Sequence, residues 1–106
     1  MTNVNELMKV EQSLLEIKEK YYFQLDLNEL LKLNHYLSEI GEITDLYFKS
    51  QVEYTKKYTD DKEGLIKYHT LLEKSQVDYD LSETLSFVND IYNKVSDKNK
   101  ELLESD

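Results

Sequence analysis

The chain of 106 residues lacks arginine, alanine, proline, cysteine and tryptophan, and it has only two glycines and two histidines. Without arginine there is no guanidinium fork to bind a phosphate or carboxylate through paired hydrogen bonds. Without cysteine there is no thiol nucleophile, disulfide or thiolate metal site. Two glycines are too few for a glycine-rich phosphate loop or a nucleophile elbow. These absences exclude several common enzyme classes.

The missing residues also indicate the kind of genome that encodes the chain. Alanine is one of the best helix formers, so the requirements of folding do not explain its absence. Alanine, proline and most arginine codons are rich in G and C, whereas the abundant lysine, asparagine, tyrosine and isoleucine have codons rich in A and T. The composition therefore predicts an AT-rich genome, such as that of a low-GC Gram-positive bacterium or one of its phages.

Length and charge limit the domain organisation and the partners. With 40% apolar and 33% charged residues, the chain is expected to fold as a single domain over residues 1–106. No apolar run approaches the ~20 residues of a membrane span, and the first ten residues lack the blocks of a signal peptide. We therefore expect a protein of the bacterial host cytoplasm with no membrane partner. A net charge of −9 argues against direct nucleic-acid binding.

Apolar residues spaced by three and four positions predict a mainly α protein, a three-helix bundle with one long helix. The first helix is expected over residues 4–21 and the second over residues 27–58, where a polar turn at 59–64 ends it. A third helix is expected from residue 81, and its polar end, residues 97–106, is expected to be a frayed tail. A short helix is expected over residues 65–74.

Two segments of the chain resemble each other and predict helix caps. Residues 23–31 and 77–85 both begin with alternating apolar and polar residues, which is typical of a short strand. Each then has an aspartate three positions before a glutamate, Asp26 with Glu29 and Asp80 with Glu83, a spacing typical of a capping box. We expect the two short strands to pair as a minor two-stranded β element, each leading into a capped helix.

Neither histidine lies in a pattern typical of a catalytic or metal site. A di-metal helix motif has glutamate three residues before histidine, but Lys32 precedes His35 and Ile66 precedes His69 at that spacing. We therefore expect no catalytic residue, no metal site and no cofactor.

One acidic cluster leaves an enzymatic alternative open. Glu39, Glu42 and Asp45 repeat every three residues on the long helix. All-helical nucleotide pyrophosphohydrolases hold magnesium between carboxylates of two helices. A magnesium-dependent all-α nucleotide hydrolase is therefore an alternative, although the interleaved Ile40 and Ile43 favour a solvated face for these carboxylates.

Aromatic residues provide the candidate interaction site. Nine residues are tyrosine, which is common in protein interfaces because its side chain is rigid and amphipathic. Tyr47, Phe48, Tyr54 and Tyr58 lie in the C-terminal half of the long helix, which extends well beyond the length of the first. We expect them to contact a protein partner, and a two-fold homodimer is one option.

The order of these features resembles a group of small uncharacterised helical proteins of Gram-positive phages and prophages. The similarity covers residues 13–91. It rests on Lys-Lys-Tyr-Thr-Asp-Asp-Lys-Glu-Gly at residues 56–64, after the long helix, and on Leu-Leu-Glu-Lys-Ser-Gln-Val-Asp-Tyr-Asp-Leu at residues 71–81. The group has no established activity, so the resemblance implies a setting: a phage or prophage product that acts in a bacterial cytoplasm.

From these observations we expect a non-enzymatic phage or prophage protein that acts by protein–protein interaction with a partner that the sequence does not identify. One alternative is an acidic inhibitor that mimics DNA and occupies a nucleic-acid site of a host or defence protein. Its candidate carboxylates are Glu11, Glu16, Glu19, Asp60, Asp61, Glu63, Asp78 and Asp90. The magnesium-dependent hydrolase is the second alternative.

Overall fold

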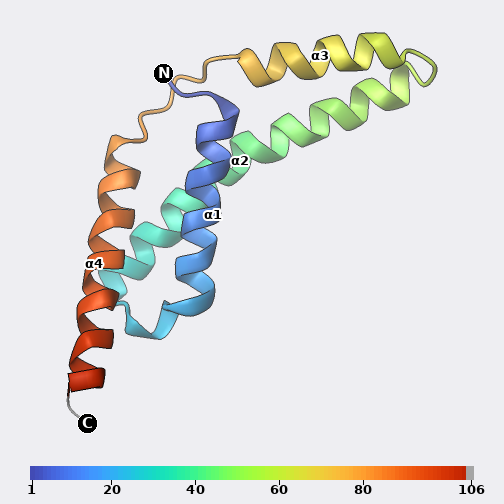
Figure 1. Cartoon of the computed structure of the whole chain (residues 1–106). Helices are drawn as coiled ribbons and strands as arrows, with labels where there is room; N and C mark the ends of the chain where they lie inside the picture. The colour runs from blue at the N-terminus through green and yellow to red at the C-terminus, as the bar shows by residue number, and fades with distance from the viewer. Residues whose placement is uncertain (105–106) are drawn as a thin grey trace.

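The computed structural model describes the backbone of residues 1–104 and the side chains of residues 1–95 (Figure 1). Within these residues the elements are α1 (Val4–Lys20), the 3₁₀ turn η1 (Tyr22–Gln24), α2 (Leu27–Lys57), α3 (Lys62–Lys74) and α4 (Ser82–Glu104). The predicted mainly α fold with one long helix is therefore confirmed. α2 has 31 residues and is about 47 Å long at 1.5 Å per residue. The predicted frayed tail, residues 97–106, lies outside the described side chains.

The core lies in a body formed by α1, the N-terminal half of α2 and α4 (Figure 1). α1 buries one face because its apolar residues recur every three or four positions, the period of an α-helix. Between α2 and α4, the rings of Tyr36 and Phe87 lie 5.4 Å apart. The buried side chains of this cluster are Leu7, Val10, Leu14, Ile17, Leu33, Tyr36, Ile40, Leu81, Phe87, Val88, Ile91 and Val95.

A capping box closes the N-terminus of α2. The N–H of Glu29 donates to Asp26 Oδ1 at 2.9 Å, and the N–H of Asp26 donates to Glu29 Oε1 at 2.9 Å. These bonds satisfy backbone donors that the start of a helix leaves free. Lys94 of α4 forms an ion pair with Glu29, so the same cap connects the start of α2 to α4.

The start of α4 differs from the predicted capping box. α4 begins at Ser82, and Asp80 Oδ1 accepts the N–H of Ser82 at 2.9 Å. This hydrogen bond lowers the pKa of Asp80. A box needs its glutamate at the third helical position, but Glu83 occupies the second. Asp80 therefore satisfies one donor of the first turn, and the box predicted for Asp80 and Glu83 is not formed within the described residues.

The minor β element is present, but its pairing differs from the prediction. Val77 forms an antiparallel bridge with Thr2, with N–O distances of 2.9 and 2.7 Å, and not with residues 23–25. The Thr2 hydroxyl also donates to the carbonyl of Tyr79 at 2.6 Å. Residues 22–24 form η1 in place of a strand, because backbone hydrogen bonds close the short connection between the antiparallel α1 and α2 into turns.

α2 and α3 extend beyond the rest of the molecule as a two-helix arm, defined as residues 48–74 (Figure 1). We call the rest of the chain the body, and its described part is residues 1–47 and 75–104. Tyr47 is the last buried residue of α2, and none of the residues of α3 is buried. The molecule measures 62 × 25 × 20 Å. Its radius of gyration is 18.0 Å, against about 13 Å for a compact domain of this length. The arm accounts for this elongated shape.

The glycines of α2 and α3 have different surroundings. A Cβ atom at Gly41 would meet Glu11 Oε2 at 3.7 Å, which is an ordinary contact. A Cβ atom at Gly64 would lie 2.0 Å from Asp61 Oδ2 and 2.1 Å from the Tyr54 hydroxyl. Gly64 therefore makes room for two polar groups at the tip of the arm, whereas Gly41 does not need to be glycine.

Alanine substitutions at these glycines are expected to have opposite effects. Gly41→Ala should raise the free energy of unfolding by about 0.5–1 kcal/mol, because alanine favours a helix and fits the space. Gly64→Ala should lower it by about 1 kcal/mol, because the methyl group displaces Asp61 from Tyr54 and outweighs the gain in helix propensity. Urea denaturation of both variants measures the two signs. Equal stabilisation by both would contradict the crowded tip.

Candidate functional site

Aromatic contacts hold the two helices of the arm together. The rings of Tyr54 in α2 and Tyr68 in α3 are stacked, with 5.0 Å between centroids and 17° between planes. Nearer the body, the Tyr47 hydroxyl lies 3.2 Å from His69 Nδ1. Tyr47 is buried and Tyr54 is half-buried, so two of the four predicted interaction residues contact α3 of their own chain.

Asp61 closes the tip of the arm. Its Oδ1 caps α3 by accepting the N–H of Gly64 at 2.9 Å, and its Oδ2 accepts the Tyr54 hydroxyl at 2.9 Å. The hydrogen bond from Gly64, and then the one from Tyr54, lower the pKa of Asp61 because both favour the carboxylate. The hydrogen bond between Tyr54 and Asp61 also raises the pKa of Tyr54. One carboxylate therefore caps α3 and also binds α2.

The arm is expected to loosen at its tip in acid. The folded-state pKa of Asp61 lies below its unfolded value, so its stabilising contribution is present above the unfolded pKa and is lost as the pH falls through the folded pKa. An NMR titration of the Asp61 carboxyl carbon should give a pKa below 3.8 in the wild type. Tyr54→Phe, which removes one donor, should raise that pKa. An Asp61 pKa that does not change in Tyr54→Phe would contradict the hydrogen bond.

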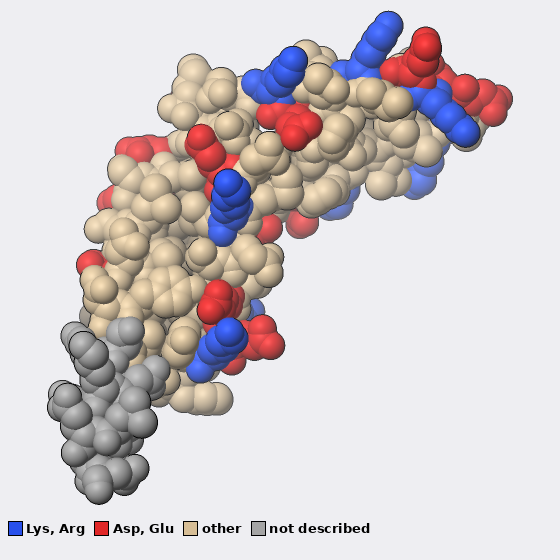
Figure 2. All heavy atoms as spheres, viewed as in Figure 1, with Lys and Arg blue, Asp and Glu red and all other residues tan. Residues whose placement is uncertain are grey.

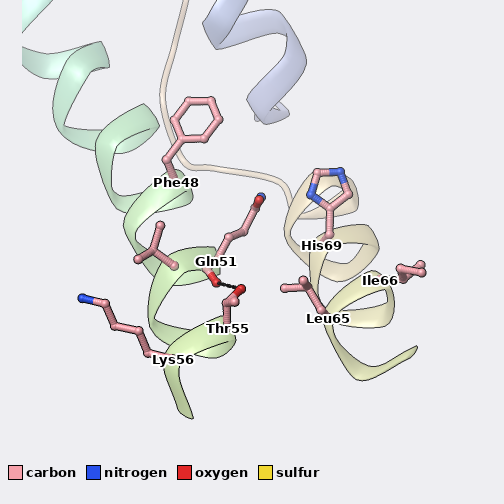
Figure 3. Close-up of a pocket in the computed structure, with 8 residues that line it drawn as sticks. Phe48, Gln51, Thr55, Lys56, Leu65, Ile66 and His69 are labelled. Carbon is pink, nitrogen blue, oxygen red and sulfur yellow. Dashed lines mark hydrogen bonds between the residues drawn. The ribbon is translucent and has the colours of Figure 1, made fainter. Parts of the chain in front are cut away.

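A groove of about 540 Å³ lies between α2 and α3 on one face of the arm, and we call it the arm groove (Figure 3). Gln51 and Leu65 point into the space between the helices. Three apolar side chains of the arm groove remain exposed: Phe48 by 52%, Val52 by 51% and Ile66 by 65%. The lining residues are Phe48, Gln51, Val52, Thr55, Lys56, Leu65, Ile66 and His69.

Polar groups flank the apolar centre of the arm groove. Lys56 lies toward the tip of the arm. Toward the base, His69 Nε2 lies 3.5 Å from Glu73 Oε2. An apolar centre with a polar rim is the arrangement found in protein–protein interfaces. Clusters of exposed apolar side chains in a depression mark interaction sites more often than scattered ones do.

The opposite face of the arm is a weaker candidate. It has a hollow of about 370 Å³, and Lys49, Glu53 and Lys57 are among the lining residues. Tyr58 also lines this hollow and is 47% exposed. Charged residues are depleted in the centres of interfaces, so the arm groove is the better candidate surface.

The arm groove includes one of the four predicted interaction residues, Phe48, while Tyr58 lies on the opposite face. The sequence reasoning missed Val52 and Ile66. Val52 follows Phe48 by four residues and so lies on the same side of α2. The prediction considered aromatic residues only and therefore did not include Val52. Ile66 belongs to the short helix expected at residues 65–74 and is 65% exposed on it.

The carboxylates of the hydrolase alternative do not converge. Glu39 Oε1 lies 2.9 Å from His35 Nε2, and Glu39 Oε2 accepts the Tyr79 hydroxyl at 2.8 Å. Burial, and then this hydrogen bond, raise the pKa of Tyr79 to about 12. Glu42 and Asp45 are exposed. Among the described residues, no three histidine or acidic side chains are grouped in a way that suits a metal ion.

Charge is distributed unevenly between the arm and the body. The arm has six lysines and five acidic residues, a net charge of +1, whereas the body has seven lysines and 17 acidic residues, a net charge of −10. Figure 2 shows lysines and carboxylates mixed along the arm. Of the carboxylates predicted for DNA mimicry, Asp60, Asp61 and Glu63 lie at the tip of the arm, and the other five lie in the body.

Within the described residues, the arm groove is the feature that best fits a functional site. None of the helices in that part of the chain carries the length of apolar sequence that crossing a bilayer requires. No protein-family model matches the chain, and no curated protein or solved structure is significantly similar to it.

Proposed function

We propose that the protein is a non-enzymatic binding protein and that the arm groove is its contact surface for a protein partner. The observation that carries this proposal is the arm itself. Two helices held together by Tyr54 and Tyr68 leave an apolar groove that the rest of the described chain does not cover. The amino-acid composition, which is typical of an AT-rich genome, and the family resemblance support a phage or prophage product in a bacterial cytoplasm as its setting.

The exposed apolar side chains of the arm groove supply a useful binding free energy. Phe48, Val52 and Ile66 each offer on the order of 100 Å² of apolar surface. Burial of that area at about 25 cal/mol per Å² corresponds to roughly 2.5 kcal/mol for each side chain. All three lie on helices, so their backbone is already ordered before binding and little entropy is lost there.

Mimicry of DNA by the body is a second candidate function, and the net charge of −10 on the body favours it. A surface of this charge attracts a basic partner at long range, and salt weakens the attraction. In this case the contact surface is the body and not the arm groove.

Affinity capture from an extract of the native host separates the two candidates. Ile66→Glu places a charge in the arm groove, and Leu31→Glu is the matched control, because Leu31 is 60% exposed on α2 within the body. We expect wild type and Leu31→Glu to capture the same protein, and Ile66→Glu to capture at least about tenfold less of it, corresponding to a loss near 1.4 kcal/mol. Circular dichroism confirms that each variant is folded.

The salt dependence of capture distinguishes the two candidate functions. Binding through the arm groove should survive an increase from about 0.1 M to about 0.5 M salt, because apolar burial is not screened. Equal binding of every partner by Ile66→Glu and wild type, whether a host protein or a second copy of this chain, would contradict the proposal. Capture that is equal in both and lost at the higher salt concentration would favour DNA mimicry by the body.

A further inference from the structure

We infer that the partner in the arm groove is a second copy of this chain, bound in an antiparallel, two-fold arrangement. This deepens the proposed function and rests on it, because it names the occupant of the same surface. The tip of each arm lies against the base of the other arm, so that two helical hairpins form a four-helix bundle. The exposed side chains of both arm grooves then face the centre of that bundle.

The division of charge favours this arrangement. Each body has a net charge of −10, so two bodies that lie side by side repel each other, whereas an arm with a net charge of +1 adds little repulsion. The molecule is 62 Å long, and the arm projects from one end of it (Figure 1). Antiparallel arms place the two bodies at opposite ends, farther apart than the Debye length of about 8–10 Å. Parallel arms would bring the bodies together.

Two charged residues at opposite ends of the arm are complementary under the same two-fold relation. Lys56 lies one residue before the end of α2, at the tip, and Glu73 lies one residue before the end of α3, at the base. A two-fold axis through the middle of the arm groove brings Lys56 of each copy to Glu73 of the other. The Lys56 side chain is 71% exposed, and its contact with Glu53 is long, at 3.9 Å. The Glu73 side chain is 42% exposed, although its carboxylate also accepts a hydrogen bond from Asn5 Nδ2 of α1 at 3.2 Å and lies 3.5 Å from His69 Nε2.

The apolar area of the arm groove sets the expected strength of the dimer. Phe48, Val52 and Ile66 together offer roughly 300 Å² per copy. Because interfaces are about 60% apolar, full contact buries about 500 Å² per copy, or about 1,000 Å² in total. This lies at the lower limit for a specific interface and well below an obligate dimer. We therefore expect a dimer that dissociates in the micromolar range.

Sedimentation velocity of the full chain from about 5 to 500 µM tests the inference. The wild type should change from a monomer of 12.7 kDa toward a dimer as its concentration rises. Ile66→Glu should remain monomeric, and Leu31→Glu, with its charge in the body, should dimerise like the wild type. A wild type that is monomeric throughout, or a dimer that persists in Ile66→Glu, would overturn the inference.

Charge reversal tests the antiparallel register. Lys56→Glu and Glu73→Lys should each raise the dimer dissociation constant about tenfold, because each brings like charges together. The double variant should return to within about threefold of the wild type, because the pair is restored with exchanged signs. A double variant that is as weak as the single variants would overturn the pairing of tip with base.

The dimer and the proposed function can fail separately. A monomeric wild type, combined with an Ile66→Glu variant that loses a host protein in affinity capture, would refute the second copy as occupant and leave the proposed function standing. If Ile66→Glu changes neither the oligomeric state nor the capture, both proposals are wrong.

Discussion

Replacing Leu33 by alanine is expected to lower the free energy of unfolding by about 2–5 kcal/mol. Leu33 is fully buried in the body, in the cluster that α1, α2 and α4 share. Truncation removes apolar contacts and leaves a cavity that the surrounding helices close only partly. A domain of this size has a total stability of about 5–15 kcal/mol, so the loss is a large fraction of it. Urea denaturation followed by circular dichroism measures the change.

Leu31→Ala is the control for this experiment, because Leu31 lies on the same helix and is 60% exposed. Its substitution should change the free energy of unfolding by less than about 0.5 kcal/mol. Equal losses of stability from Leu33→Ala and Leu31→Ala would contradict the burial of Leu33 in the core of the body.

Replacing Tyr54 by alanine is expected to open the arm and leave the body folded. The substitution removes the stack on Tyr68, the hydrogen bond to Asp61 and the contact with the Tyr58 ring. We expect a loss of about 2–3 kcal/mol in the local stability of the arm, by analogy with other truncations of aromatic residues. None of the residues of α3 is buried, and its contacts with Tyr47 and Asn5, through His69 and Glu73, lie at the base of the arm, away from Tyr54.

Hydrogen exchange followed by mass spectrometry measures this local opening. Amides of α3 should exchange roughly 30- to 150-fold faster in Tyr54→Ala, while amides of α1 keep the wild-type rate. Leu46→Ala is the control, because Leu46 is 65% exposed on the same helix, lies outside the arm groove and should change these rates little. Faster exchange throughout the body would contradict an arm that opens independently.

Periodicity and cap chemistry are strong local signals, and they were enough to predict the helices of the body and the capping box of α2. The spacing of Leu7, Val10, Leu14 and Ile17 marks the buried face of α1 because a helix repeats every 3.6 residues. The pair Asp26 and Glu29 forms its capping box because both hydrogen bonds are made within four consecutive residues. Such local signals do not depend on where the other helices lie.

The pairing of distant segments was not predictable in the same way. The bridge joins Thr2 to Val77, and the sequence offers no local sign that the N-terminus reaches that segment. The residues from Phe23 onward alternate like a strand, but the short connection between α1 and α2 forms η1 there, and the chain turns back too soon for these residues to reach Val77.

The residues that line the arm groove were predictable only in part, because aromatic residues have two roles in the arm. Tyr47 and Tyr54 join α2 to α3, whereas Phe48 remains exposed in the arm groove. The same residue types occur in both roles, so the sequence alone does not distinguish a residue that packs between the helices from one that stays exposed. The side of α2 against which α3 packs determines which role each residue has. Val52 and Ile66 form one surface only because α3 packs against α2.

Hydrogen exchange of the wild type at two protein concentrations decides whether the arm groove is a contact surface between copies. Between about 5 and 500 µM, we expect slower exchange at the higher concentration for amides of residues 48–57 and 62–74, because binding stabilises the closed arm by mass action. Amides of α1 should exchange at the same rate at both concentrations. Arm amides that exchange equally fast at both concentrations, or a slowing confined to α1 and α4, would contradict the arm groove as the contact surface.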